Sequence, residues 1–508
     1  MSEHQHQTVL ILDFGSQYTQ LIARRVRENR VYCEIHPFDL SEEEIRRRQP
    51  IGVILSGGPQ SVYAPGAPVR GEELFELGVP VLGICYGMQL IAVALGGEVE
   101  RADRREYGRA EITIDSPGLL FEGLEERETV WMSHGDRVLE LPPDFMLTAR
   151  TANAPAVAFE SEFRKIWGIQ FHPEVNHTLH GGEMLRNFLY GICGARGDWR
   201  IADYLDEAVA AVQQQVGDRR VLCALSGGVD STVVAALLQR AIPDGFTAVF
   251  VDNGLLRKGE VQQVCHVLGD ELGFPIHLVQ AADRFLETLA GVVDPEEKRR
   301  MVGRTFIEVF EKEAHRLHGA ELLAQGTLYP DVIESTSVKG PSAVIKTHHN
   351  VGGLPERLGF ELVEPLRALF KDEVRQLGRE LGLPEEVLER HPFPGPGLAV
   401  RVLGEVTAER LELLREADRI FLDELHENGY YGRVSQAFAV LLPCKSVGVM
   451  GDERTYEEVV ALRSVDTRDF MTADWSPLPH ALLGHIAGRI VNEVRGINRV
   501  VYDITSKP

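Results

Sequence analysis

The stretch VLGICYGMQ, residues 81–89, decides the fold of the first part of the chain. An apolar strand leads into a tight turn at Cys85, and a helix follows at once. Gly83 and Gly87 flank the turn, where they allow a sharp bend and a close approach of a substrate. This order predicts an α/β fold with the cysteine side chain clear of the backbone. A buried structural cysteine is the alternative that the stretch alone leaves open.

Short apolar runs alternate with helical patterns over residues 8–190. The pattern predicts strands at 8–13, 51–55, 79–84, 111–114, 130–132 and 165–171, and helices at 18–29 and 183–192. Because parallel strands need crossover helices between them, this alternation indicates an α/β domain with a largely parallel sheet. The glycine-containing segment 194–198 is a predicted linker, so the first domain is expected to span 1–194.

The stretch GIQFHPE, residues 168–174, supplies polar partners for the cysteine. His172 ends a predicted strand and Glu174 follows two residues later, so both side chains can lie on one side of the chain. Glu174 can then orient His172. His172 can take a proton from Cys85 and return it to a leaving amine. The pattern predicts nucleophilic catalysis at Cys85.

A second α/β domain, predicted at 195–385, opens on RVLCALSGGVDST, residues 220–232. A buried strand leads into a glycine-rich loop and a helix, so backbone amides and the helix dipole can hold a phosphate. The loop lacks the lysine of a Walker A sequence. Further strands are expected at 246–251 and 321–324, and VDNG at 251–254 lies where such sheets bind a nucleoside. A plain glycine-rich connection is the alternative for the loop taken alone.

The prolines of HPFPGPG, residues 391–397, predict a break that neither a helix nor a central strand can cross. A smaller α+β domain at 386–508 is expected to contain this break. Its predicted elements are a strand at 398–403, a helix at 408–427, strands near 433–450, a helix at 478–495 and a strand at 499–504.

Composition limits the classes of function. The 508 residues suggest about three domains, and 44% hydrophobic residues exclude a disordered chain. The net charge of −23 argues against nucleic-acid binding through a basic surface. Six cysteines lie far apart without a CxxC pair, and the N-terminus has no signal-peptide pattern, so we expect a cytoplasmic protein. Residues 79–97 carry no charge, but Pro80 and the glycines favour a buried strand–turn–helix over a membrane span.

GICYGMQ together with GIQFHPEV resembles the class I, triad-type glutamine amidotransferases. The resemblance implies that Cys85 attacks the glutamine side-chain amide, that ammonia leaves, and that water hydrolyses the thioester. SGGP at 56–59 is similar to the family's oxyanion loop, which implies that the N–H groups of Gly58 and Tyr86 stabilise the oxyanion. SHGD at 133–136 is expected either near the substrate or in a solvated loop.

SGGVDS resembles the PP-loop of ATP pyrophosphatases, which implies an adenine-nucleotide α-hydrolase-like domain. By this resemblance ATP and its Mg²⁺ are held in the loop, and Asp230 is the candidate metal ligand through the phosphates. The implied ATP-binding residues are Ser226, Gly227, Gly228, Val229, Asp230, Ser231 and Thr232.

Longer motifs extend the resemblance over the whole chain, to the family of glutamine-hydrolysing GMP synthetases. These motifs are 325–335, 345–355, 391–397, 446–452 and 469–475. The resemblance implies that ATP adenylates O2 of XMP with release of pyrophosphate, and that ammonia then displaces AMP to give GMP. It implies glutamine, ATP and XMP as substrates, Mg²⁺ but no organic prosthetic group, no nucleic-acid or membrane partner, and a homodimer built by residues 398–508.

The same resemblance implies a set of lid and XMP-binding residues. These are Asp331, Glu334 and Lys346 in a lid over the nucleotides, Arg299 at the XMP phosphate, Gln436 and Lys507 closing on XMP, and Lys371 near the phosphates. A solvated loop and a solvated helix face are the alternatives for the lid and for Arg299. The family normally continues past Lys-Pro with a short tail that carries an XMP-closing carboxylate, and the given sequence stops at Pro508.

Two other functions remain open from the sequence. One is another PP-loop adenylating amidotransferase with a different acceptor, such as RNA, and the acidic net charge argues against RNA. The other is a non-catalytic sensor of glutamine or nucleotides, against which the complete set of Cys85, His172 and Glu174 argues.

Overall fold

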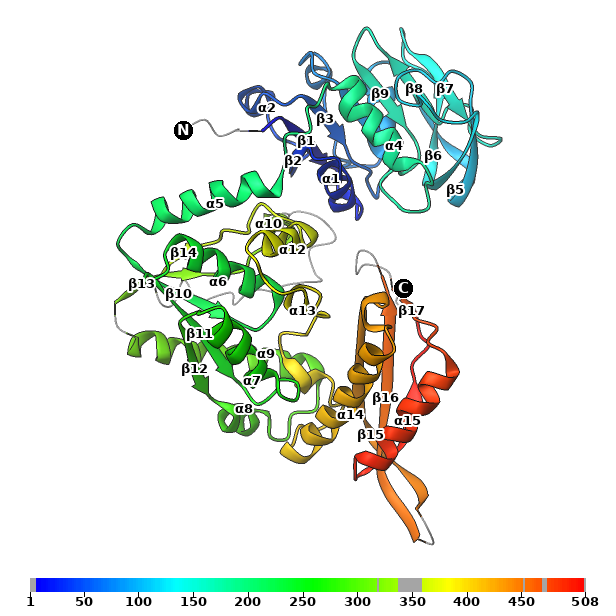
Figure 1. Ribbon diagram of the computed structural model, residues 1–508. Coiled ribbons are helices and arrows are strands. Elements are labelled where there is room, and N and C mark those ends of the chain that lie inside the picture. The colour runs from blue at the N-terminus through cyan, green and yellow to red at the C-terminus, as the bar shows by residue number, and fades with distance from the viewer. Residues whose placement is uncertain (1–5, 318, 337–358, 451–452, 468–472, 507–508) are drawn as a thin grey trace. The chain divides into compact units, whose positions relative to one another are not determined.

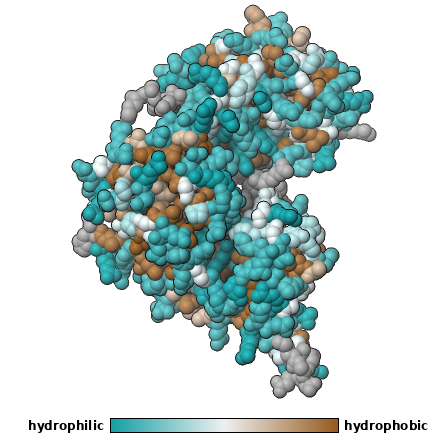
Figure 2. Space-filling model, viewed as in Figure 1, coloured by the Kyte–Doolittle hydropathy of each residue, from teal (hydrophilic) through white to brown (hydrophobic). Residues whose placement is uncertain are grey.

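The computed structural model describes residues 6–317, 319–336, 359–450, 453–467 and 473–506. The chain divides into two compact units, which Figure 1 shows with their element labels. The first unit is Met1–Tyr204 with Pro330–Lys346, and the second is Leu205–Tyr329 with Thr347–Pro508. Polar side chains cover most of the face shown in Figure 2, as expected for a chain of this charge.

The first unit is built on a nine-stranded sheet of order β2-β1-β3-β4-β9-β8-β7-β5-β6. Its strands are β1 (Thr8–Asp13), β2 (Tyr32–Pro37), β3 (Gly52–Leu55), β4 (Val81–Ile84), β5 (Glu98–Ile114), β6 (Arg127–Glu140), β7 (Met146–Arg150), β8 (Ala158–Ser161) and β9 (Ile166–Ile169). The pairs from β2 to β9 are parallel, and the pairs from β9 to β6 are antiparallel.

The sheet is therefore mixed, where the sequence predicted a largely parallel one. The strands predicted at 111–114 and 130–132 are parts of the long antiparallel pair β5 and β6. The segment between these two strands contains no helix, so no crossover is available and they pair antiparallel. The other predicted strands of this unit are confirmed within a few residues.

The helices of the first unit are α1 (Thr19–Glu28), α2 (Glu42–Arg48), η1 (Glu72–Leu74), α3 (Tyr86–Ala94), α4 (Gly181–Arg186) and η2 (Asn187–Ile192), and α5 (Ile201–Val216) contains the boundary between the units. Residues 86–92 of α3 are all buried, so this helix is apolar on every side. That confirms the buried strand–turn–helix predicted for the uncharged stretch. Among the described residues no helix is long and apolar enough to cross a membrane.

The second unit contains a parallel five-stranded sheet of order β12-β11-β10-β13-β14. The strands are β10 (Arg220–Leu225), β11 (Phe246–Asp252), β12 (Ile276–Gln280), β13 (Ala320–Ala324) and β14 (Glu361–Val363). The helices are α6 (Val229–Ala241), α7 (Glu260–Val264), η3 (Cys265–Glu271), α8 (Ala282–Leu289), α9 (Pro295–Arg316), α12 (Lys371–Glu380) and α13 (Glu385–Leu388). Helix α10 (Tyr329–Thr336) follows β13 in the chain, and from Pro330 on it is assigned to the first unit. The strand order reverses at β10, where α/β sheets bind their ligands.

The C-terminal part of the second unit packs two helices on a four-stranded sheet. Its elements are η4 (Gly397–Val400), α14 (Ala408–Glu427), η5 (Tyr431–Arg433), β15 (Gln436–Met450), β16 (Glu453–Asp466), β17 (Asp474–Trp475), α15 (His480–Glu493) and β18 (Ile497–Tyr502). One hydrophobic core continues from β11 and α9 into α14, β15 and α15. The predicted helices and the other strands here are confirmed.

The strand predicted at 398–403 is wrong. Residues 397–400 form a 3₁₀ turn, and the N–H of Leu398 donates to the carbonyl of Leu255 at 2.7 Å. Gly397 has a φ of 61°, and a Cβ there would lie 2.5 Å from the same carbonyl. A short apolar run that is buried shows no periodicity that distinguishes a strand from a buried turn. For that reason the sequence pattern predicted a strand here.

Candidate active sites

The turn after β4 places the thiol of Cys85 at the start of α3. Cys85 has a φ of 53° and ψ of −103°, a conformation that side-chain-bearing residues rarely adopt. Its N–H donates to the carbonyl of Ile169 at 2.8 Å, which ties the turn to β9. A Cβ on Gly87 would lie 2.6 Å from the carbonyl of Leu55, so the helix approaches β3 as closely as only glycine allows. The predicted sharp turn with flanking glycines is confirmed.

His172 and Glu174 follow β9 and are both buried. Nδ1 of His172 lies 2.7 Å from Oε1 of Glu174. The backbone of His172 is fixed twice, because its N–H donates to the carbonyl of Trp131 at 3.0 Å and its carbonyl accepts from the Thr178 hydroxyl at 2.6 Å. Since Nδ1 faces the carboxylate, Nε2 is the ring nitrogen that can exchange a proton with a thiol.

The surroundings of His172 favour its charged form. Burial disfavours the charge, but the carboxylate of Glu174 and the sulfur of Cys85 favour it more strongly, so the pKa of His172 lies well above its ordinary value. A histidine that lies between a thiol and a buried carboxylate can take the proton of the thiol as a base and later return it as an acid. The arrangement therefore provides a nucleophile, its base and an orienting group.

Two glutamines beside Cys85 were not singled out by the sequence analysis. Nε2 of Gln170 lies 3.6 Å from Sγ of Cys85, and Oε1 of Gln170 accepts from Nε2 of Gln89 at 3.2 Å. Gln89 also donates to the carbonyl of Asp136 at 3.0 Å. The signal was present in spacing, because Gln89 follows Cys85 by one helical turn and Gln170 precedes His172 by two residues.

Loop 56–59 lies against the first residue of α3. A Cβ on Gly58 would lie 3.0 Å from Cγ of Tyr86, and one on Gly57 would lie 3.2 Å from Cε1 of His172. Tyr86 opens α3, so its N–H has no partner within the helix. Burial raises the pKa of the Tyr86 hydroxyl to about 12, and that hydroxyl donates to the carbonyl of Pro68. Gly58 and Tyr86 are thus brought together beside His172.

Residues 133–136 form part of β6, so the solvated-loop alternative for SHGD is wrong. The carbonyl of Ser133 accepts from the Cys85 thiol at 3.8 Å, so this part of β6 lies next to the candidate nucleophile. His134 is buried, and its Nε2 lies 3.1 Å from Oε2 of Glu106 on the paired strand β5. Side chains alternate between the two faces of a strand, and the His134 side chain points into the protein. There the carboxylate of Glu106 replaces water as its partner.

The loop between β10 and α6 is tied to itself by side chains. The hydroxyls of Ser226 and Ser231 lie 2.9 Å apart, and the N–H of Ser226 donates to the Ser231 hydroxyl at 3.1 Å. Thr232 donates to the carbonyl of Gly228 at 2.8 Å. Gly227 has a φ of 77°, and Gly228 caps α6, so Val229 is the first helical residue. The loop holds the first amides of a helix at the switch point of the sheet, which is a phosphate-binding geometry.

Asp230 has the chemistry that a magnesium–nucleotide complex needs. Its Oδ2 lies 3.4 Å from Nζ of Lys371, whereas its Oδ1 is buried without a hydrogen-bond partner among the described residues. Those residues contain no cluster of three or more His, Cys, Asp or Glu that could hold a metal. Since Mg²⁺ is commonly bound by one or two carboxylates together with substrate phosphates, the single free oxygen of Asp230 fits it.

Gly326 lies against this loop and Gln325 precedes it, and neither residue was predicted as a site residue. A Cβ on Gly326 would lie 3.3 Å from the N–H nitrogen of Ser231. Nε2 of Gln325 is buried and has no hydrogen-bond partner within the described part of the chain. Asp252 ends β11, and the N–H of Gly254, two residues later, donates to the Asp252 carboxylate at 3.0 Å.

Three of the candidate lid and XMP-binding residues have side chains that the structure describes, and these are Arg299, Gln436 and Asp331. Arg299 is exposed on α9 and forms an ion pair with Glu296. Gln436 opens β15 and donates to the carbonyl of Pro392 at 2.8 Å. Asp331 lies in the first turn of α10. Lys346, Lys507 and the side chain of Glu334 lie outside the described residues.

Lys298, next to Arg299, is the buried member of the basic run. Its Nζ donates to the carbonyls of Ala399, Val402 and Gly404 at 3.2, 2.7 and 2.5 Å. Burial, with a smaller effect of Arg410, lowers the pKa of Lys298 to about 8. The run therefore uses one lysine to hold the segment that follows the proline break.

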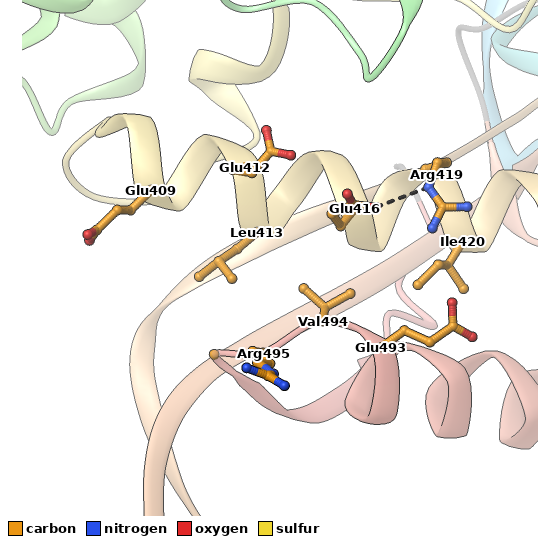
Figure 3. Close-up of a pocket in the computed structure, with 10 residues that line it drawn as sticks. Glu409, Glu412, Leu413, Glu416, Arg419, Ile420, Glu493, Val494 and Arg495 are labelled. Atoms are coloured by element: carbon orange, nitrogen blue, oxygen red, sulfur yellow. Dashed lines mark hydrogen bonds and ion pairs between the residues drawn. The ribbon is translucent and has the colours of Figure 1, made fainter.

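A groove of about 760 Å³ lies between α14 and the end of α15 (Figure 3). Its floor is apolar and its rim is mainly acidic, with Arg419 paired to Glu416 at 3.0 Å. The lining residues are Glu409, Glu412, Leu413, Glu416, Arg419, Ile420, Glu493, Val494, Arg495 and Gly496. The groove contains none of the sequence-predicted site residues, and its acidic rim is unfavourable for phosphates.

Comparison with known proteins identifies three parts of the chain. The family described as glutamine amidotransferase class-I matches residues 10–192, asparagine synthase matches 200–293, and GMP synthase C terminal domain matches 423–508. The chain is 57% identical over 504 residues to the GMP synthase (glutamine-hydrolyzing) of Aquifex aeolicus, covering 99% of this chain and 98% of that protein. It is 58% identical over 512 residues to the protein of the same name from Aromatoleum aromaticum, with the same coverage. The chain belongs to the family of glutamine-hydrolysing GMP synthases, which are ATP-using ligases.

Proposed function

We propose that the chain makes GMP at two separate sites, one that releases ammonia from glutamine and one that activates XMP with ATP. The observation that carries the proposal is the presence of two local geometries in one chain. One is the buried contact of His172 with Glu174 beside Cys85, and the other is the free carboxylate oxygen of Asp230 in a phosphate-binding loop. Ammonia supply and carbonyl activation together amount to amide-nitrogen transfer.

At the first site the thiolate of Cys85 attacks the side-chain carbonyl carbon of glutamine, and His172 holds the proton that the thiol gives up. The N–H groups of Gly58 and Tyr86 stabilise the oxyanion, each worth about 3 kcal/mol of barrier in comparable enzymes. His172 then returns its proton to the leaving nitrogen, and ammonia departs. Water attacks the thioester carbon, the C–S bond breaks, and glutamate leaves with Cys85 restored.

At the second site O2 of XMP attacks the α-phosphorus of ATP, and the bond to the pyrophosphate oxygen breaks. The loop 226–232 holds the phosphates through its backbone N–H groups and the N-terminus of α6. Asp230 would hold Mg²⁺ together with the phosphates, and the ion would neutralise charge on the leaving pyrophosphate. Lys371 supplies a second positive charge near Asp230. Ammonia then attacks C2, and AMP leaves with the oxygen.

The remaining assignments complete the proposal. Glutamine hydrolysis belongs to residues 1–194, adenylation to 195–385, and XMP closure with dimerisation to 386–508. The homodimer is supported by large apolar side chains exposed on the C-terminal sheet, namely Val447, Tyr456, Trp475 and Val501. XMP is contacted by Arg299, Gln436 and Lys507, under a lid that contains Asp331, Glu334 and Lys346. A cytoplasmic location is supported by the six cysteines, none of which forms a disulfide.

The test is formation of AMP and pyrophosphate by the full chain with ATP, Mg²⁺ and ammonium salt, with XMP compared against IMP, xanthosine and a tRNA transcript. We expect AMP formation with XMP alone among these acceptors. AMP formation with tRNA, together with tight and salt-sensitive tRNA binding, would establish the RNA-modifying alternative instead. Ammonia release from glutamine, measured in the same preparation, would exclude a non-catalytic sensor.

A further inference from the structure

Arg390 joins the phosphate-binding loop to the segment of the proline break. It follows α13 and precedes His391. Its Nη1 donates to the carbonyl of Gly227 at 2.8 Å, and its Nη2 donates to Oε1 of Gln263 at 2.9 Å. Glu260 lies 3.6 Å from the same Nη2, and the Arg390 side chain is 18% exposed. A guanidinium held at two points by polar partners has a fixed orientation.

The carbonyl that Arg390 holds controls the direction of a loop amide. A trans peptide points its C=O and the following N–H to opposite sides. Fixing the carbonyl of Gly227 therefore fixes the N–H of Gly228, which points into the loop toward Oγ of Ser226 at 3.3 Å. Gly227 has a positive φ, a conformation in which glycine has several alternatives of similar energy. An external contact is needed to select one of them.

The residues that follow Arg390 hold the beginning of β15. Nδ1 of His391 accepts from the N–H of Ala437 at 3.2 Å, and the carbonyl of Pro392 accepts from Gln436 at 2.8 Å. Three consecutive residues thus contact the phosphate loop on one side and the first residues of β15 on the other. Gln436 is the XMP-contacting residue of the proposed function, so this segment connects the groups assigned to ATP and XMP.

We propose that Arg390 is a positioning residue for adenylation, which acts through the carbonyl of Gly227 and does not itself touch substrate. The inference rests on the proposed function and deepens it. Attack of O2 of XMP on the α-phosphorus, with the electron pair leaving on pyrophosphate, requires the reacting atoms to be held in line. Arg390 holds the loop in the conformation that binds the phosphates, at a fixed distance from β15.

The experiment compares four variants of the full chain: Arg390→Ala, Arg390→Lys, Gln263→Ala and the control Arg379→Ala. Arg379 is a surface arginine of α12 whose partners are Glu385 and Glu389, so its loss removes a similar charge away from the loop. The measurement is XMP-dependent exchange of labelled pyrophosphate into ATP, with kcat and the KM for ATP. Glutamine hydrolysis without nucleotides reports that the rest of the chain is intact.

We expect Arg390→Ala to lower kcat/KM for ATP in the exchange by about 10- to 100-fold, the effect of one charge-assisted hydrogen bond. Arg390→Lys keeps the charge but not the two-point contact, and it should recover little of the loss. Gln263→Ala frees the orientation of Arg390 and should fall between. Added guanidinium ion should partly restore Arg390→Ala, and Arg379→Ala should match the wild type.

The outcomes separate this inference from the function on which it rests. Exchange in Arg390→Ala within twofold of the control overturns the inference alone. Full recovery in Arg390→Lys also overturns it, because a charge near the phosphates is then sufficient. Absence of XMP-dependent exchange in the wild type overturns the proposed function, and the inference with it. If Arg390→Ala does not fold, Arg390→Lys and Gln263→Ala decide, and wild-type values in both count against the inference.

Discussion

The glutamine site and the nucleotide site differ in the kinds of group that build them. At the first, Cys85, His172 and Glu174 are in contact, and Gly58 and Tyr86 lie beside them. At the second, the phosphate loop is formed by backbone groups, and Oδ1 of Asp230 has no hydrogen-bond partner among the described residues. The glutamine site therefore has the preassembled side chains that amide hydrolysis uses, whereas the nucleotide site has a loop for phosphates and one carboxylate for their metal.

Two buried histidines, His172 and His391, differ in the kind of partner that they have. His172 has a carboxylate and a thiol as partners, and its pKa is raised. His391 is bonded to backbone groups, and burial lowers its pKa to about 4, opposed in part by a hydrogen bond to Tyr431. A raised pKa keeps a proton available for transfer, and a lowered one keeps the ring neutral as a packing group. The partner, and not burial, distinguishes the catalytic candidate from the structural residue.

The largest expected effect is at the preassembled site. Cys85→Ala should reduce glutamate release from glutamine by at least ~10⁴-fold, because removal of a nucleophile leaves only binding and the oxyanion contacts. The measurement is glutamate formation in the absence of nucleotides. Cys444→Ala, at an exposed cysteine, is the matched control and should retain the wild-type rate. Residual hydrolysis above a few per cent would show that Cys85 is not the nucleophile.

The next largest effect is expected at the nucleotide site. Asp230→Ala removes the free carboxylate oxygen, and XMP-dependent pyrophosphate exchange should fall by about 100-fold or more. Basal glutamine hydrolysis should stay within twofold of the wild type. Asp244→Ala, on an exposed turn of the same unit, serves as control. Equal loss of both activities in Asp230→Ala would contradict the independence of the two sites.

A smaller effect is expected when loop 56–59 of the glutamine site is changed. A methyl group on Gly58 would press on the Tyr86 ring and the Phe14 carbonyl, at 3.0 and 3.1 Å. Gly58→Ala should therefore displace an oxyanion donor and lower kcat for glutamine hydrolysis by about ten- to 100-fold. Gly182→Ala, where a Cβ meets nothing within 4 Å, should be silent. An unchanged kcat in Gly58→Ala would argue that this loop does not form the oxyanion site.

The last expected effect is on stability and not on a reaction rate, and it distinguishes the two histidines. Because the pKa of His391 is lowered to about 4 in the folded chain, its contribution is present above the unfolded value of about 6.5 and is lost as the pH falls toward 4. The full loss is about 3 kcal/mol. In His391→Gln the unfolding temperature of the second unit should depend less steeply on pH between pH 7 and 5. Calorimetry measures this dependence. His266→Gln, at an exposed histidine, should leave this pH dependence unchanged. If the unfolding temperature of His391→Gln falls with pH as steeply as that of the wild type, the lowered pKa of His391 is refuted.

The sequence could predict the elements and sites that are encoded in short continuous stretches. The turn at Cys85, the His172–Glu174 spacing and the phosphate loop each need fewer than ten residues to be recognised. Local periodicity was also sufficient for β10, β11 and α14, which are confirmed.

The features that the sequence could not predict depend on contacts between distant residues. Arg390 contacts Gly227 across 163 residues, and no local pattern links them. The buried turn at 397–400 has the apolar character of a strand, and only its contact with Leu255 explains its conformation. The antiparallel half of the first sheet depends on the absence of a helix between β5 and β6. Tertiary packing decided each of these outcomes.

The most direct test of the account is GMP formation by Cys85→Ala with two nitrogen sources, ammonium salt and glutamine, in the presence of XMP, ATP and Mg²⁺. We expect a rate near that of the wild type with ammonium salt and no detectable GMP with glutamine. Loss of GMP formation with both nitrogen sources, in a folded variant, would contradict the division of the reaction between two sites.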